Sequence, residues 1–166
     1  TTFQVNHLSH FLLTNLLIEL IKKSDDGRII NVSSIAHQNA QLDWDNLNAE
    51  KFYEPYYAYA LSKLANILFT KELNDKIKGM NVTTYSLHPG VISTKLLMQG
   101  FNITGESLEK GAATSVYLAI SENIKKYSGE YFIDKKVSPS LRLTYDKNVY
   151  SKFWDVSFEM VKKHLN

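Results

Sequence analysis

The sequence predicts an α/β fold that forms one side of a larger, mainly parallel sheet flanked by helices. Apolar positions alternate along the chain between helical spacing and short β-branched runs, so helices and strands follow each other in turn. The chain shows three such strands, whereas the mean sheet has about 5 to 6. We therefore expect further strands upstream of residue 1 and interpret residues 1–166 as a single, partial domain.

The first half of the chain predicts a helix, a strand, a long loop and a second helix. Residues 1–23 carry apolar side chains at three- and four-residue steps, typical of a half-buried helix. Residues 28–33 are a β-branched run of strand length. Residues 35–54 have no sustained period and are expected to be a loop with one helical turn. The helical pattern returns at 56–78, where Gly79 ends it.

The second half continues the alternation of strands and helices. A strand is expected at residues 81–88, where Pro89 and Gly90 end it. A helix at 106–121, a strand at 129–133 and an amphipathic helix at 145–164 follow. Strands separated by helices favour parallel pairing.

Composition and charge exclude several classes of function. A hydrophobic content of 44% with 22% charged residues is ordinary for a globular protein. The net charge of +2 comes from nearly balanced acids and bases and gives no argument for a nucleic-acid partner. The absence of cysteine excludes disulfides and thiol catalysis. The five histidines have no zinc-ligand spacing, so no metal site is expected.

A tyrosine and a lysine one helical turn apart are the first candidates for catalysis. Tyr59 and Lys63 both fall on the helix expected at residues 56–78. Side chains at i and i+4 lie about 5 to 6 Å apart on one helix face. A phenol normally has a pKa near ~10, and a neighbouring ammonium lowers that pKa by favouring the phenolate. The pair could therefore move a proton at working pH.

The tyrosine-lysine spacing is not specific by itself, because Tyr131 and Lys135 repeat it. That second pair falls on an expected strand, where four residues separate the side chains by roughly 13 Å. For Tyr59 and Lys63 the alternative is an ordinary surface pair. The serine pair Ser33-Ser34 shifts the balance, because it ends the preceding strand. Ligands bind at the carboxyl ends of strands in open α/β sheets, although a cap of the following turn is the alternative role for these serines.

Three further ordered motifs surround this pair. The chain reads Asn-Val-Ser-Ser, then Tyr-Ala-Leu-Ser-Lys, then Leu-His-Pro-Gly-Val-Ile-Ser-Thr, after an opening Val-Asn-His-Leu-Ser-His-Phe-Leu-Leu-Thr. In this order the motifs resemble those of the short-chain dehydrogenases/reductases over essentially the whole chain. The opening helix, the spacing from Ser34 to Tyr59 and the Gly-Glu-Tyr-Phe stretch are most similar to the retinol dehydrogenase and WW-domain oxidoreductase branch. The resemblance implies the C-terminal part of a Rossmann-type doubly wound sheet whose N-terminal dinucleotide-binding strands are absent.

The resemblance also implies a catalytic set. Tyr59 would be the general acid/base, and Lys63 would lower its pKa and bind the nicotinamide ribose. Ser34 would orient the substrate oxygen, with Ser33 as the less favoured member of the pair. Asn6 would support a proton relay to Lys63; an ordinary polar helix residue is the alternative for this position.

The cofactor residues implied by the resemblance follow the strand at 81–88. Pro89 and Gly90 would turn the chain, Ile92 would meet the nicotinamide carboxamide through its backbone, and Thr94 would contact amide or phosphate. Tyr59 and Lys63 complete the set. The family's Gly-x-Gly loop, which holds pyrophosphate, has no counterpart among the glycines of this chain. NADP is the cofactor that the branch implies, with NAD as the alternative.

Two functional hypotheses follow. The first is an NAD(P)-dependent oxidoreductase that interconverts an apolar alcohol and a carbonyl, such as a retinoid or related lipid, as part of a longer polypeptide. The second is a truncated, catalytically inactive chain that acts at most through subunit association. The resemblance implies a homodimer through residues 1–23 and 56–78. It also implies an intracellular location, cytoplasmic or at the cytosolic face of the endoplasmic reticulum, with membrane association only through a segment upstream of Thr1.

Overall fold

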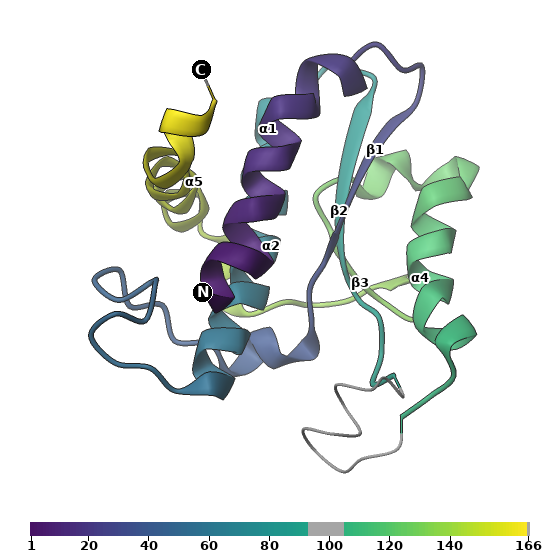
Figure 1. Ribbon diagram of the computed structural model, residues 1–166. Helices are drawn as coiled ribbons and strands as arrows, with labels where there is room; N and C mark the ends of the chain where they lie inside the picture. The colour runs from purple at the N-terminus through teal and green to yellow at the C-terminus, as the bar shows by residue number, and fades with distance from the viewer. Residues whose placement is uncertain (93–104, 166) are drawn as a thin grey trace.

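The computed structural model describes residues 1–92 and 105–165, which form a four-stranded sheet with helices on both faces (Figure 1). The strands follow the order β1 (Gly27–Val32), β2 (Val82–His88), β3 (Tyr131–Ile133) and β4 (Lys136–Val137). The first three strands are parallel, and β4 is antiparallel to β3. The prediction of a mainly parallel α/β fold is confirmed.

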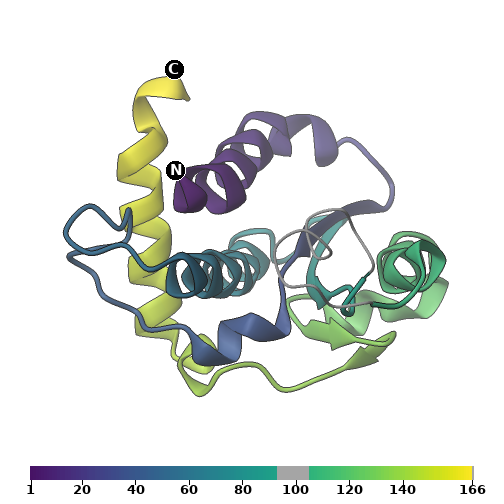
Figure 2. The same cartoon turned by 60° about the horizontal axis from the view of Figure 1, so that its bottom comes forward.

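The main helices are α1 (Ser9–Ile21), α2 (Pro55–Lys76), α4 (Leu108–Ile120) and α5 (Lys147–Val161). Helices α1 and α2 lie on one face of the sheet with α5 packed outside α2, and α4 covers the other face (Figure 2). Short helical segments complete the fold: η1 (Gln4–Leu8), η2 (Ile35–Asn39), η3 (Glu122–Tyr127), η4 (Arg142–Tyr145) and η5 (Lys162–His164). Among the described residues no helix is both long and apolar enough to cross a bilayer.

The helix expected at residues 1–23 contains a feature that the apolar pattern did not predict. Its first part, η1, is a π-helix, and α1 continues from it without a break. Single π-turns inside helices are rare and often occur at functional sites. The wider turn brings the backbone carbonyl and the side chain of Asn6 to α2, which binds both.

The strand expected at 129–133 is the first half of a hairpin, and its second half was missed. Asp134 and Lys135 connect β3 to β4, and both have positive φ angles, 47° and 63°. Two-residue hairpin turns of this kind usually carry Asn or Asp followed by Gly. Lys135 stands where Gly is usual, which explains why no hairpin was expected here.

Helix α2 is the most extensively buried of the helices. It begins at Pro55, and the Glu54 carboxylate caps it by accepting hydrogen bonds from Tyr56 N and Tyr57 N. Nearly all of its side chains from Ala60 to Leu73 are buried between the sheet, α1 and α5. The apolar face that the sequence suggested for dimerisation is therefore largely covered within the chain, whereas α1 leaves several leucines exposed: Leu13, Leu16, Leu17 and Leu20.

The carboxyl ends of β1 and β2 lie side by side, because Val32 is paired with Leu87 in a parallel register. Residues that follow these two strands in sequence are brought to the same edge of the sheet. Among the described residues β1 pairs only with β2, so its other edge has no neighbour there.

Candidate active site

Tyr59 and Lys63 lie on one face of α2, as the helical spacing requires. The Lys63 Nζ is 5.6 Å from the centroid of the Tyr59 ring. The ring is 37% exposed, so a substrate can reach it. Lys63 is half-buried, and burial lowers the pKa of its ammonium below the usual value. The second tyrosine-lysine match is different: Tyr131 is buried in β3, where burial raises its pKa, and Lys135 lies in the hairpin turn.

The two serines after β1 have different hydrogen bonds. The Ser33 Oγ donates to the backbone carbonyl of Lys63 at 2.7 Å and thereby joins the end of β1 to α2. The Ser34 Oγ accepts from Ala36 N at 3.2 Å and caps η2. A hydroxyl has one proton to donate. That of Ser33 is already used, and that of Ser34 remains available for a substrate oxygen.

Asn6 is connected to the Tyr59–Lys63 turn by hydrogen bonds through its side chain. Its Nδ2 donates to the Ser62 Oγ at 3.1 Å, and this hydroxyl donates to Tyr59 O at 2.7 Å. The Asn6 carbonyl accepts from Asn66 Nδ2 at 3.1 Å. Asn6 is therefore fixed to α2 at two points, next to the pair expected to carry catalysis.

Asn66 is a residue that the sequence did not single out. It is fully buried on α2, and its Nδ2 donates both to Asn6 O and to Val32 O, each at 3.1 Å. The Lys63 Nζ donates to the same Val32 carbonyl at 3.4 Å. Asn66 thus joins η1, the end of β1 and the lysine. The available sequence signal for Asn66 was its place as the one polar residue in the apolar run 64–69.

The hydrogen bonds of Asn66 extend to His7, which is fully buried. Its Nε2 is 2.9 Å from the Ser157 Oγ on α5, and its Nδ1 is 3.3 Å from the Asn66 Oδ1. The Asn66 oxygen can only accept, so the histidine proton belongs on Nδ1 and Nε2 accepts from Ser157. Burial lowers the pKa of His7 to about 3, which keeps the ring neutral.

The segment after β2 carries the positions expected to meet a cofactor. Gly90 has a φ of 95°, and a Cβ there would lie 3.2 Å from the Glu106 Oε2. Ile92 bridges Glu106 in parallel, and its side chain lies on Gly111 of α4, where a Cβ would come within 2.7 Å of the Ile92 Cγ1. The sequence did not single out Gly111. Thr94 lies outside the described residues.

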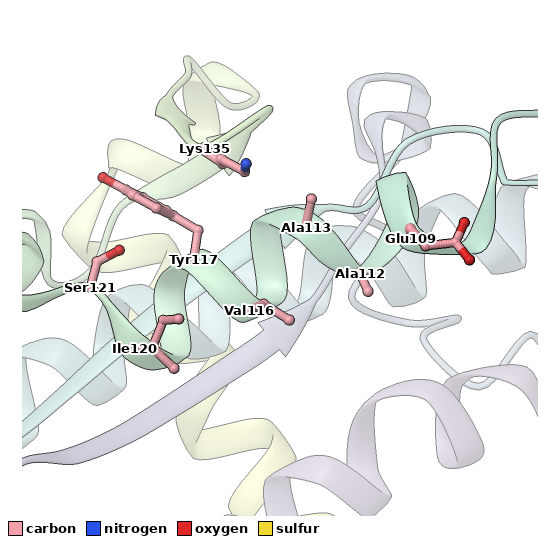
Figure 3. Close-up of a pocket in the computed structure, with 8 residues that line it drawn as sticks. All are labelled: Glu109, Ala112, Ala113, Val116, Tyr117, Ile120, Ser121 and Lys135. Atoms are coloured by element: carbon pink, nitrogen blue, oxygen red, sulfur yellow. The ribbon is translucent and has the colours of Figure 1, made fainter.

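A separate hollow lies along α4, on the other face of the sheet. It measures ≈ 380 Å³ (Figure 3). Its lining comes from α4, the residue after it and the β3–β4 turn: Glu109, Ala112, Ala113, Val116, Tyr117, Ile120, Ser121 and Lys135. It contains none of the expected catalytic residues. Among residues 1–92 and 105–165 no group of metal-ligating side chains gathers here or elsewhere.

Known proteins resemble this chain in sequence and in fold. The sequence profile of the short chain dehydrogenase family matches residues 1–102. The chain belongs to this family. Mouse retinol dehydrogenase 11 is 42% identical to it over 166 residues, which are 95% of this chain and 52% of that protein. The chain thus spans about half the length of this relative.

Solved structures share the fold of this chain. A putative uncharacterized protein from Mycobacterium paratuberculosis superposes with a TM-score of 0.76 at 29% identity, over 96% of this chain and 58% of the other. A 4-hydroxyisoleucine dehydrogenase complexed with NADH superposes with a TM-score of 0.57 at 25% identity, over 78% and 54%. The prediction of a retinol dehydrogenase-like short-chain dehydrogenase is confirmed. The prediction of a partial Rossmann-type sheet is confirmed as well.

Proposed function

We propose that the full-length protein containing this chain is an NAD(P)-dependent oxidoreductase that interconverts an alcohol and a carbonyl. The observation that carries the proposal is the solvent-accessible Tyr59 beside Lys63, at the sheet edge where Ser33 and Ser34 end β1. Family membership supports the oxidoreductase class. The roles of individual residues rest on their chemistry.

Tyr59 would donate a proton to the carbonyl oxygen in reduction and accept one from the alcohol in oxidation. Lys63, whose Nζ lies 5.6 Å from the centroid of the Tyr59 ring, would bind the nicotinamide ribose beside the group that transfers the proton. The free hydroxyl proton of Ser34 would bind the substrate oxygen and stabilise charge on it. Asn6, held to α2 by its hydrogen bonds with Ser62 and Asn66, would support a water-linked proton relay that reaches Lys63.

A nicotinamide dinucleotide would supply the hydride when bound. Tyr59, Lys63, Pro89, Gly90 and Ile92 would hold its nicotinamide end. The fit is supported by Gly90, whose positive φ lets the chain turn directly after β2. Thr94 is proposed as a further contact. NADP is the proposed form, with NAD as the alternative; the NADH complex of 4-hydroxyisoleucine dehydrogenase is consistent with either, because both carry the same nicotinamide.

The proposed substrate is an apolar alcohol or aldehyde, of retinoid or lipid type. Support comes from the apolar and aromatic side chains exposed near Ser34 and at the start of α2: Ile35, Tyr56 and Tyr57. The name of mouse retinol dehydrogenase 11 points the same way. We place residues 1–166 in a single domain of a cytoplasmic protein or one on the cytosolic face of the endoplasmic reticulum.

The test uses the full-length protein with NADPH and a panel of aldehydes that includes retinal. Tyr59→Phe should lower kcat by about 100-fold or more, as the loss of a general acid does. Tyr127→Phe is the matched control, because Tyr127 is as exposed as Tyr59 but lies in η3, outside the candidate site, and should change kcat little. Equal activity of the two variants would contradict the assignment.

A second candidate function is association without catalysis. It is favoured by the lack of any Gly-x-Gly element in the 166 residues and by the exposed leucines of α1. Titration of the 166-residue chain with NADPH separates the candidates. Stoichiometric binding, followed by nucleotide fluorescence, would exclude the second candidate, and absence of binding together with self-association would favour it.

A further inference from the structure

His37 follows Ser34 by three residues and is a completely buried residue of η2. Its two ring nitrogens contact two separate parts of the chain. The Nδ1 is 2.7 Å from the Ser34 carbonyl oxygen, and the Nε2 is 3.1 Å from the Leu141 backbone nitrogen. The ring also packs edge-on against Tyr131, with centroids 4.9 Å apart. His37 therefore joins the end of β1 to the segment before η4.

These contacts permit one state of the ring. The Leu141 N–H can only donate, so Nε2 must be an unprotonated acceptor. The remaining proton then belongs on Nδ1, which donates to Ser34 O. A doubly protonated ring would place a donor against the Leu141 N–H, and burial already lowers the pKa of His37. The hydrogen bonds thus define a neutral, Nδ1-protonated imidazole.

The Ser34 carbonyl receives a second hydrogen bond from the same residue, because His37 N donates to it at 3.1 Å. The backbone and the side chain of His37 both hold the peptide unit that follows Ser34. The Ser34 Oγ meanwhile accepts from Ala36 N inside the same turn. Rotation of this peptide unit would break both hydrogen bonds from His37, so the backbone conformation of the residue that carries this hydroxyl depends on His37.

We propose that His37 is a positioning residue for the reaction, which acts by fixing Ser34 in the orientation that binds the substrate oxygen. This proposal rests on the proposed oxidoreductase function, because it assumes that Ser34 contacts the substrate. Small displacements of a positioned group can lower a rate strongly without any loss of binding. The effect of His37 should therefore appear in kcat more than in KM.

Two substitutions separate the two hydrogen bonds. His37→Asn places an amide where Nδ1 lies and can still donate to Ser34 O. His37→Gln reaches the position of Nε2 and can still accept from Leu141 N–H. In the full-length protein with NADPH and an aldehyde, we expect His37→Gln to lower kcat about tenfold and His37→Asn to retain most of it. The KM for the aldehyde should change little in both.

The control is the same pair of substitutions in a Ser34→Ala background. If His37 acts through the Ser34 hydroxyl, His37→Gln should cause no further loss of kcat there. A loss that persists without that hydroxyl, equal losses in the Asn and Gln variants, or unchanged activity in both would overturn the proposal.

A measurement on the unsubstituted protein keeps the proposal testable if the variants fail to fold. The nitrogen-15 chemical shifts of His37 report which ring nitrogen carries the proton. The proposal requires protonation on Nδ1, and protonation on Nε2 would overturn it. This result does not depend on activity. Failure of the oxidoreductase proposal would instead appear as no NADPH-dependent turnover by the unsubstituted full-length protein, so the two failures are distinguishable.

Discussion

At the residue scale, the buried histidine His7 makes stability depend on pH. Its pKa is about 3 in the folded protein and near 6.5 when exposed. Between these values the unfolded chain binds the additional proton. Folding stability is therefore complete above about pH 6.5 and is lost as the pH falls toward 3, by at most about 1.4 kcal/mol per pH unit.

We expect His7→Asn to weaken this dependence, because the amide can still donate to the Asn66 Oδ1 but does not titrate. Urea unfolding at pH 7 and pH 5 measures the free energy of unfolding for both proteins. His164→Asn is the control, since His164 is exposed in η5. The interpretation is wrong if the unsubstituted protein and His7→Asn lose the same stability between the two pH values.

Asn66 gives a second prediction at this scale. Asn66→Ala removes the donor to two carbonyls, Asn6 O and Val32 O, in a buried position. Leaving buried acceptors without partners costs roughly 1 to 3 kcal/mol, which thermal unfolding should show as a lower Tm. Asn15→Ala is the matched control, because the Asn15 Nδ2 also donates to a backbone carbonyl, that of Phe11, but on the partly exposed α1. A Tm shift as small as that of the control would contradict the bridging role of Asn66.

At the element scale, Gly111 lets α4 approach the segment after β2. Glycine inside a helix normally costs about 1 kcal/mol relative to alanine, and here the Ile92 side chain occupies the space of the missing Cβ. Gly111→Ala should displace Ile92 and raise the KM for the nicotinamide cofactor. The double variant Gly111→Ala with Ile92→Ala should recover part of that loss because it removes the clash. An unchanged cofactor KM in Gly111→Ala would show that cofactor binding does not depend on the packing of Ile92 against Gly111.

The elements also show where sequence reasoning ends. Helices, strands and their order follow from periodicity, and the bounds of α2 and β2 differ from the prediction by at most two residues at either end. Within the π-turn at η1, Asn6 donates to the Ser62 Oγ and accepts from the Asn66 Nδ2, and both partners are distant in sequence. The β3–β4 turn uses Lys135 with a positive φ, a conformation that a lysine does not indicate.

At the scale of the whole molecule, the exposed leucines of α1 predict self-association of the 166-residue chain. Leu13, Leu16 and Leu20 are each more than half exposed, and they recur at helical spacing. Contiguous apolar surface of this kind is usually covered by a partner. Leu16→Lys with Leu20→Lys should lower the sedimentation coefficient of the chain at high concentration. Val116→Lys with Ile120→Lys on α4 is the control, and an equal effect there would contradict a role specific to α1.

The candidate site was predictable to the extent that its residues share motifs. Tyr59, Lys63 and Ser34 are found from spacing and strand ends, and the structure brings them to one edge of the sheet. His37 and Gly111 were not found, because their roles depend on contacts with Leu141 and Ile92 that no local pattern contains. Residues that position others leave little trace in a single sequence.

We propose that the full-length protein transfers hydride between a nicotinamide cofactor and a carbonyl with Tyr59 as the proton donor. The most direct test uses NADPH that carries deuterium at the transferable position, the full-length protein and an apolar aldehyde. We expect deuterium on the carbinol carbon of the product, formed by the unsubstituted protein and about 100-fold more slowly by Tyr59→Phe. Alcohol without deuterium, or transfer by Tyr59→Phe at the unsubstituted rate, would contradict it.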